Sequence, residues 1–168
     1  LDDASDFAMS VMQSIVIFHA GQGCAIPTRL FVPRSRYEEA LKALEMAYAG
    51  FATKWGDFDD PTQVMGPVIS ARQRDRVMEY IALGQKEGAR LLTGGKARTD
   101  KGGGFFIEPT CFVDVRNEMR IAREEIFGPV LVVIPYEDDE DAIRLANDSD
   151  YGLGGSVIGG DKARAMGV

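Results

Sequence analysis

Apolar residues recur along the chain with two spacings, one typical of helices and one typical of strands. The helical spacing predicts helices over residues 7–18, between Ser35 and Gly50, between Ser70 and Gly88, and over 139–147. Apolar runs predict strands over residues 29–33, 89–92, 105–115, 130–135 and 153–159. Strands that alternate with helices favour an α/β fold with an open, mostly parallel sheet flanked by helices.

Short polar signals predict where three of these helices begin. Ser35 with Glu38 and Ser70 with Gln73 form the capping-box pattern, in which a hydroxyl accepts a hydrogen bond from the backbone three residues later. Asp138 is a further N-cap candidate, directly before residues 139–147.

Composition narrows the class of protein. The 168 residues are 45% hydrophobic, enough for one domain with a core. The net charge is −7 and the basic residues are scattered among the acids, which argues against a nucleic-acid partner. Apolar runs are well short of the roughly 20 residues that cross a bilayer, and the chain does not open on a signal peptide. We therefore expect no membrane partner and a cytoplasmic location.

Cysteine and histidine usage points away from metals and disulfides. Cys24 and Cys111 are too few for a disulfide framework, and the single His19 gives no metal-binding spacing with them. Cys111 falls in an apolar strand pattern, which is typical of a core position.

Cys24 is placed differently, in the loop sequence HAGQGCAIP of residues 19–27. A nucleophilic cysteine needs exposure and a backbone that can approach a reacting carbonyl, and the neighbouring glycines supply that freedom. A buried structural cysteine remains the alternative. A hydrolase-type pair with His19 is less favoured, because such a base usually comes from a distant part of the chain.

A second candidate motif is REEIFGPV, residues 123–130. It places two carboxylates, an aromatic ring and a Gly-Pro turn before the buried strand, and ligands gather at strand ends in α/β sheets. The alternative is a solvated helix end followed by a turn. Glycine clusters at 102–104 and 152–155 lack a phosphate-binding pattern and are interpreted as turns.

Three motifs together resemble the aldehyde dehydrogenase superfamily: GQGC with the following Arg29, EEIFGPV, and NDSDYGLGGSV. The resemblance covers nearly the whole chain in order and spacing. It implies that residues 1–168 are the catalytic domain of an NAD(P)-dependent dehydrogenase that oxidises an aldehyde to a carboxylic acid. The cofactor-binding domain would lie outside these residues. Both ends of the chain look cut, which fits one domain of a longer enzyme.

The resemblance also implies roles for three residues. Cys24 matches the nucleophile, which forms a thiohemiacetal and then a thioester, with its backbone N–H holding the oxyanion. Glu125 matches the carboxylate that binds the nicotinamide ribose, and Phe127 matches the aromatic residue near the nicotinamide. The implied cofactor is NAD or NADP, with a small-molecule aldehyde as substrate and a homo-oligomer at full length. A catalytically idle homologue and a thiol esterase are the alternatives.

Overall fold

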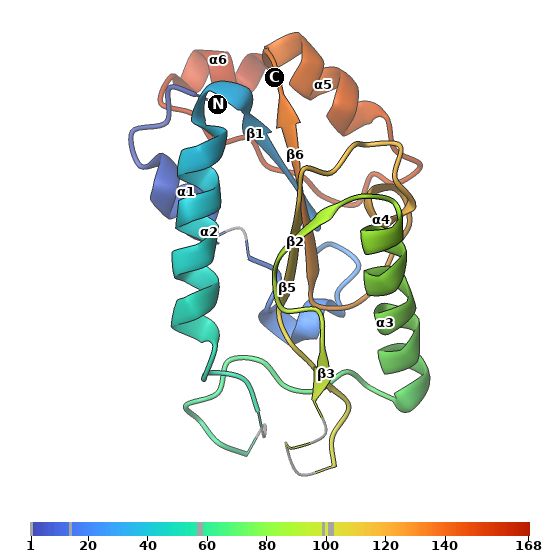
Figure 1. Ribbon diagram of the computed structural model, residues 1–168. Coiled ribbons are helices and arrows are strands. Elements are labelled where there is room, and N and C mark those ends of the chain that lie inside the picture. Colours follow the sequence, from blue (N-terminus) through green and yellow to red (C-terminus); the bar gives the residue numbers. More distant parts are fainter. Residues whose placement is uncertain (1, 14, 57–58, 99, 101–102) are drawn as a thin grey trace.

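The central feature of the computed structural model, which describes residues 2–13, 15–56, 59–98, 100 and 103–168, is a mixed, mostly parallel sheet (Figure 1). Strand β6 pairs in parallel with β1 and with β5, and β2 adds antiparallel to β5. In spatial order the strands of this sheet are β1 (Arg29–Pro33), β6 (Val130–Tyr136), β5 (Thr110–Val113) and β2 (Arg90–Thr93). The predicted open α/β class is confirmed.

Helices cover both faces of the sheet, with α2 on one side and α3 on the other (Figure 1). The α-helices are α1 (Phe7–Gln13), α2 (Tyr37–Phe51), α3 (Ala71–Lys86), α4 (Arg120–Arg123), α5 (Asp139–Asn147) and α6 (Lys162–Gly167). Two 3₁₀ turns, η1 (Phe18–Gly21) and η2 (Arg34–Arg36), and a small hairpin sheet of β3 (Ala97–Arg98) with β4 (Phe106–Ile107) complete the described elements.

The core lies between the sheet and these helices. Strand β5 contributes side chains to the core on both faces of the sheet. All four residues of β5 are buried. Cys111 is beside Tyr48 of α2, whereas the ring of Phe112 approaches Gly84 of α3. Because alternate side chains of a strand point to opposite faces, a strand covered on both faces is apolar throughout.

Two of the three predicted caps are present. The Ser70 hydroxyl accepts from the Gln73 N–H at 3.2 Å, and the Asp138 carboxylate accepts from the Asp141 N–H at 2.9 Å. The capping box at Ser35 is wrong, because residues 34–36 form the turn η2 and α2 begins at Tyr37 with no side-chain cap. The prediction that Gly50 ends α2 is also wrong. Gly50 does not have the positive φ of a helix-ending glycine, and the helix continues through it to Phe51.

Two other predictions are corrected. The helix predicted over residues 7–18 ends at Gln13, and Ile15–Ile17 are buried without helical geometry; Ser14 lies outside the described residues. Burial, rather than a helix, explains why residues 15–17 are all apolar. Residues 153–159 form no strand: within the described chain they pair with no other strand, and Leu153 is 63% exposed.

Among the described residues, no helix combines the length and apolar character that crossing a bilayer requires. Of the glycine clusters, Gly103 has the positive φ of 88° expected in a turn, while Gly102 lies outside the described residues.

Candidate active site

Cys24 and Cys111 have opposite environments. Cys24 lies in an exposed turn after η1, and Cys111 is fully buried; both are free thiols. Burial raises the pKa of Cys111 to about 12, partly offset by a hydrogen bond with Tyr48. A thiol with so high a pKa is a poor nucleophile at neutral pH, which leaves Cys24 as the candidate.

The backbone before Cys24 turns sharply. His19, Ala20 and Gly21 all have positive φ, at 52°, 52° and 69°. Side chains rarely adopt this left-handed region, so packing must hold it there. These three residues lead the chain from the buried Ile17 to the exposed Cys24, as the sequence motif suggested.

Gly21 joins the two motifs predicted to carry the chemistry. A Cβ placed on Gly21 would lie 1.9 Å from the Gly128 carbonyl oxygen and 2.9 Å from the Pro129 nitrogen. Only glycine allows the two backbones to approach this closely. The Cys24 loop therefore packs directly on the FGP turn of the second motif.

Strand order explains why these motifs meet. The Cys24 loop leads into β1, the FGP turn leads into β6, and the two strands are parallel neighbours. Segments that precede parallel neighbours meet at the same end of the sheet. The candidate site therefore lies at the amino ends of the strands, which the sequence alone left open.

Glu125 and Phe127 occupy the loop between α4 and β6. Glu125 is exposed, and Phe127 is half-buried with a positive φ of 60°. Among the described residues no side chain is hydrogen-bonded to the Glu125 carboxylate, so it is available to a ligand. The roles of Glu125 and Phe127 at a cofactor stay predictions.

Helix α3 holds this loop in place. The Gln73 amide donates to the carbonyls of Ile126 at 3.1 Å and Phe127 at 2.7 Å, and Arg76 donates to the Glu125 carbonyl at 2.7 Å. Three consecutive carbonyls are thus bound by one helix. Sequence reasoning used Gln73 only as part of a cap and missed Arg76, although their i, i+3 spacing places them on one face.

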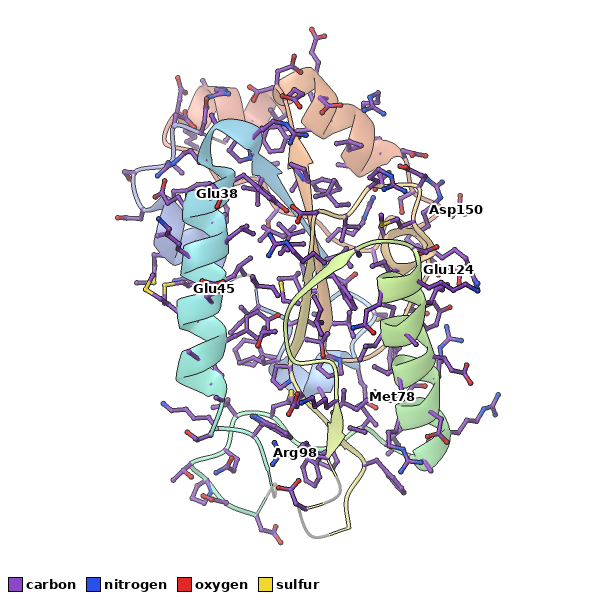
Figure 2. The ribbon with its side chains drawn as sticks, viewed as in Figure 1. Glu38, Glu45, Met78, Arg98, Glu124 and Asp150 are labelled. Carbon is purple, nitrogen blue, oxygen red and sulfur yellow. The ribbon has the colours of Figure 1, made fainter. Side chains whose placement is uncertain are left out.

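The two carboxylates of the second motif have different surroundings. Glu124 lies beside α3 (Figure 2), where it accepts from the Tyr80 hydroxyl at 2.7 Å and forms an ion pair with Arg120 at 2.7 Å. The Arg120 hydrogen bonds, with a further one from Tyr80, lower the pKa of Glu124 to about 2. Glu124 is therefore a structural carboxylate, and Glu125 is the one that faces solvent.

The third motif also reaches this end of the molecule. A Cβ on Gly154 would lie 3.5 Å from the Ala25 carbonyl, directly after Cys24. Arg29, quoted with the first motif, has a structural position: it donates to Asn117 at 2.9 Å and to the Leu145 carbonyl at 3.2 Å. The described residues include no cluster of three or more His, Cys, Asp or Glu side chains that could hold a metal ion.

Comparisons with known proteins agree with this geometry. Residues 1–168 match the profile of the aldehyde dehydrogenase family. Geranial dehydrogenase of Castellaniella defragrans is 44% identical over 167 residues, which are 99% of this chain and 34% of that protein. A putative aldehyde dehydrogenase of Staphylococcus saprophyticus is 45% identical over 96% of this chain and 34% of its own length.

Solved structures give the same result. An aldehyde dehydrogenase of Mycobacterium tuberculosis complexed with NAD⁺ superposes with a TM-score of 0.92 at 48% identity. A cysteine-to-alanine mutant of Aldehyde Dehydrogenase C from Pseudomonas syringae, complexed with NAD⁺ and octanal, superposes with a TM-score of 0.93 at 39% identity. Each match covers 99% of this chain and 34% of the solved chain, so this chain spans about a third of their length.

Proposed function

Because the chain belongs to the aldehyde dehydrogenase family, we propose that residues 1–168 form the catalytic domain of an enzyme that oxidises an aldehyde to a carboxylic acid, with Cys24 as nucleophile. The observation that carries this proposal is the close packing of Gly21 against Gly128, which brings the exposed cysteine loop onto the Glu125–Phe127 loop. The complex of a relative with both NAD⁺ and octanal supports it.

The chemistry follows from a free cysteine in an exposed loop. Cys24 Sγ attacks the aldehyde carbon, the C=O π bond breaks, and the oxyanion of the resulting thiohemiacetal is stabilised by the backbone N–H of Cys24. When bound, NAD⁺ or NADP⁺ supplies the two-electron oxidant that accepts the hydride. Hydride loss leaves a thioester on Cys24, and water then cleaves the C–S bond to release the carboxylic acid and the thiol.

The residues present fit the nicotinamide side of such a cofactor. The exposed Glu125 carboxylate can accept hydrogen bonds from two neighbouring ribose hydroxyls, and the ring of Phe127 offers an apolar surface for a planar group. The chain carries no recognised phosphate-binding glycine motif. We therefore propose that the pyrophosphate and adenosine contacts come from a separate cofactor-binding domain. As a separate proposal that the family resemblance suggests, the full-length enzyme is a cytoplasmic homo-oligomer.

Two substitutions in the full-length enzyme, with Cys111→Ala as a control, test the proposal. Cys24→Ala should abolish NAD⁺-dependent oxidation, because no covalent intermediate can form, whereas Cys111→Ala should keep it. Glu125→Gln should keep slow turnover with a larger deuterium isotope effect from labelled aldehyde, since misplacing the reacting atoms by about 1 Å costs on the order of 100-fold in rate. A fully active Cys24→Ala enzyme would remove the mechanism, and an unchanged Glu125→Gln enzyme would remove Glu125 from it.

A thiol esterase is the second candidate function, favoured by the exposure of Cys24 alone. Hydrolysis of an activated ester without NAD⁺, with no aldehyde oxidation in its presence, would identify it. An idle homologue would show neither activity, and the meeting of three motifs at one end of the sheet argues against it.

A further inference from the structure

The side chain of Gln22 ties the cysteine loop to the backbone that leads into α3. Its Oε1 accepts from the Ile69 N–H at 2.9 Å, and its Nε2 donates to the His19 carbonyl at 3.1 Å. One amide thus spans the left-handed turn and a segment 47 residues away in sequence. Gln22 lies two residues before Cys24, so this bridge fixes the loop close to the thiol.

The side chain of Gln73 ties the second loop to the same stretch. Its Nε2 donates to the carbonyls of Ile126 and Phe127, and its backbone N–H donates to the Ser70 hydroxyl. Phe127 has the unfavourable positive φ of 60°, and two hydrogen bonds from one amide group keep its flanking peptide units in that orientation. Residues 69–73 therefore support both loops from a single short segment.

We propose that Gln22 and Gln73 are positioning residues that use residues 69–73 as a common brace, holding Cys24 in a fixed position relative to Glu125 and Phe127. The inference rests on the proposed function and extends it. It gives the two glutamines separable tasks. Gln22 positions the loop that carries the thiol, and Gln73 positions only the loop that places the hydride acceptor.

Ester hydrolysis and aldehyde oxidation separate these tasks. With 4-nitrophenyl acetate, Cys24 forms a C–S bond to the acyl carbon as the C–O bond to nitrophenolate breaks, and water then hydrolyses the thioester. This reaction needs the Cys24 loop alone. Aldehyde oxidation with NAD⁺ needs the same loop and also the correctly placed Glu125 and Phe127.

The test compares both reactions in full-length enzyme, with octanal and 4-nitrophenyl acetate as probes. Gln73→Met should lower kcat for octanal roughly 10- to 100-fold with a larger isotope effect from deuterated aldehyde, and leave ester hydrolysis within about 2-fold. Gln22→Met should lower both reactions by about 10-fold. Gln85→Met, the same change at an exposed position of α3, should alter neither.

Glutamate variants add a test that general destabilisation does not predict. Gln22→Glu keeps an oxygen to accept from the Ile69 N–H but loses the donor to the His19 carbonyl, so it should recover part of both activities lost in Gln22→Met. Gln73→Glu loses both donors and directs a carboxylate at two carbonyl oxygens, so it should be at least as impaired in octanal oxidation as Gln73→Met. The same substitution therefore restores part of the activity at position 22 and none at position 73.

Arg76→Met releases the Glu125 carbonyl and removes the contacts of Arg76 with Tyr80, but it leaves both Gln73 hydrogen bonds in place. It should show the Gln73 pattern in milder form, which keeps the test decisive if Gln73 variants fold poorly. Equal loss of both reactions in the Gln73 and Arg76 variants, or no loss in either, would overturn the brace. A wild-type enzyme that hydrolyses the ester but does not oxidise octanal or another aldehyde would instead overturn the proposed function.

Discussion

At the scale of single residues, the candidate site depends on backbone conformations that most side chains disfavour. Gly21 and Phe127 both have positive φ, and the backbone of Gly21 touches that of Gly128, the residue after Phe127. Strain of this kind persists only where surrounding contacts hold it, and here the hydrogen bonds of Gln22 and Gln73 supply those contacts.

Gly21→Ala tests this contact. The added Cβ would overlap the Gly128 carbonyl and occupy a left-handed residue, so we expect the free energy of unfolding to fall by more than about 1 kcal/mol. Aldehyde oxidation should fall on the order of 100-fold if the loops separate by about 1 Å. Urea denaturation and steady-state kinetics measure both effects.

The matched control is Gly50→Ala. Gly50 lies within helix α2, and a Cβ there would meet no atom within 4 Å. This change should raise the free energy of unfolding by about 0.5–1 kcal/mol without altering turnover. Equal effects of the two alanines would show that Gly21 has no special position.

At the scale of elements, the C-terminal end of α5 depends on one half-buried polar group. Arg29 of β1 donates to the carbonyls of Leu145 and Ala146 and to the side chain of Asn117. Carbonyls at a helix end have no partner within the helix, so an arginine that binds two of them stabilises that end. This attachment also sets the start of the third motif, at Asn147.

Arg29→Met should lower the free energy of unfolding by about 1.5–3 kcal/mol, because it removes charge-assisted hydrogen bonds from the Leu145 and Ala146 carbonyls, of which Leu145 keeps only the weaker donor from Asn117. Arg34→Met provides the comparison. Arg34 pairs with Glu137, but both side chains are more than half exposed, and such pairs contribute about 0–1 kcal/mol. Comparable losses in the two variants, measured by chemical denaturation, would contradict this structural role of Arg29.

Helices and strands were predictable from sequence where the local pattern of apolar and capping residues matches the packing that the element has in the fold. The apolar run of β6 and the caps at Ser70 and Asp138 are local signals, and all three are confirmed. The strand at 153–159 failed because a strand needs a partner as well as a pattern, and the described chain offers it none. The helix over 7–18 failed because a continuous apolar run does not distinguish a helix from an irregular buried segment such as residues 15–17.

The candidate site was predictable only in part. Motifs pointed to Cys24, Glu125 and Phe127, and these remain predictions. What brings their loops together is the parallel pairing of β1 with β6, a long-range feature that periodicity does not contain. The roles of Gln22 and Gln73 were invisible for the same reason, since their partners lie 47 to 54 residues away.

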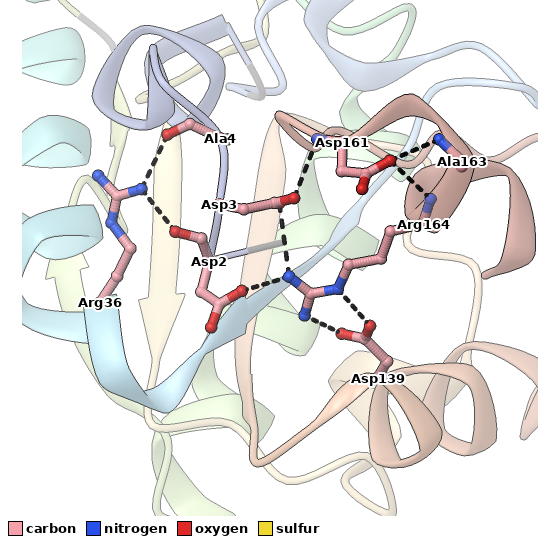
Figure 3. Close-up of polar contacts among 8 residues, drawn as sticks. All are labelled: Asp2, Asp3, Ala4, Arg36, Asp139, Asp161, Ala163 and Arg164. Carbon is pink, nitrogen blue, oxygen red and sulfur yellow. Dashed lines mark hydrogen bonds and ion pairs between the residues drawn. The ribbon is translucent and has the colours of Figure 1, made fainter.

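At the scale of the whole molecule, the N-terminal and C-terminal segments meet through one arginine (Figure 3). Arg164 of α6 forms ion pairs with Asp2 at 2.6 Å and with Asp139 of α5 at 2.6 Å. The Asp3 carboxylate accepts from the Asp161 N–H at 2.9 Å, and Asp161 caps α6. Three segments distant in sequence are thus joined at one surface.

This network predicts a particular loss of stability in acid. A hydrogen bond from Arg164 lowers the pKa of Asp2, and backbone hydrogen bonds, led by that of Asp161, lower the pKa of Asp3. A folded-state pKa below the unfolded value of about 3.8 gives stability that is fully present above that value. The contribution is lost as the pH falls through the lower folded pKa, when the carboxylates take up protons.

Arg164→Met should therefore reduce stability at pH 7 and make less difference as the pH falls through the lowered pKa values of Asp2 and Asp3, where the carboxylates of the wild-type protein take up protons. Urea denaturation of both proteins from pH 7 to pH 2 measures the difference, which should shrink only below about pH 4. High salt should reduce it at pH 7, because these charges are partly exposed. A difference that stays constant down to pH 2 would mean that Arg164 contributes through the packing of its hydrocarbon stem, and that its charge does not join the two ends of the chain.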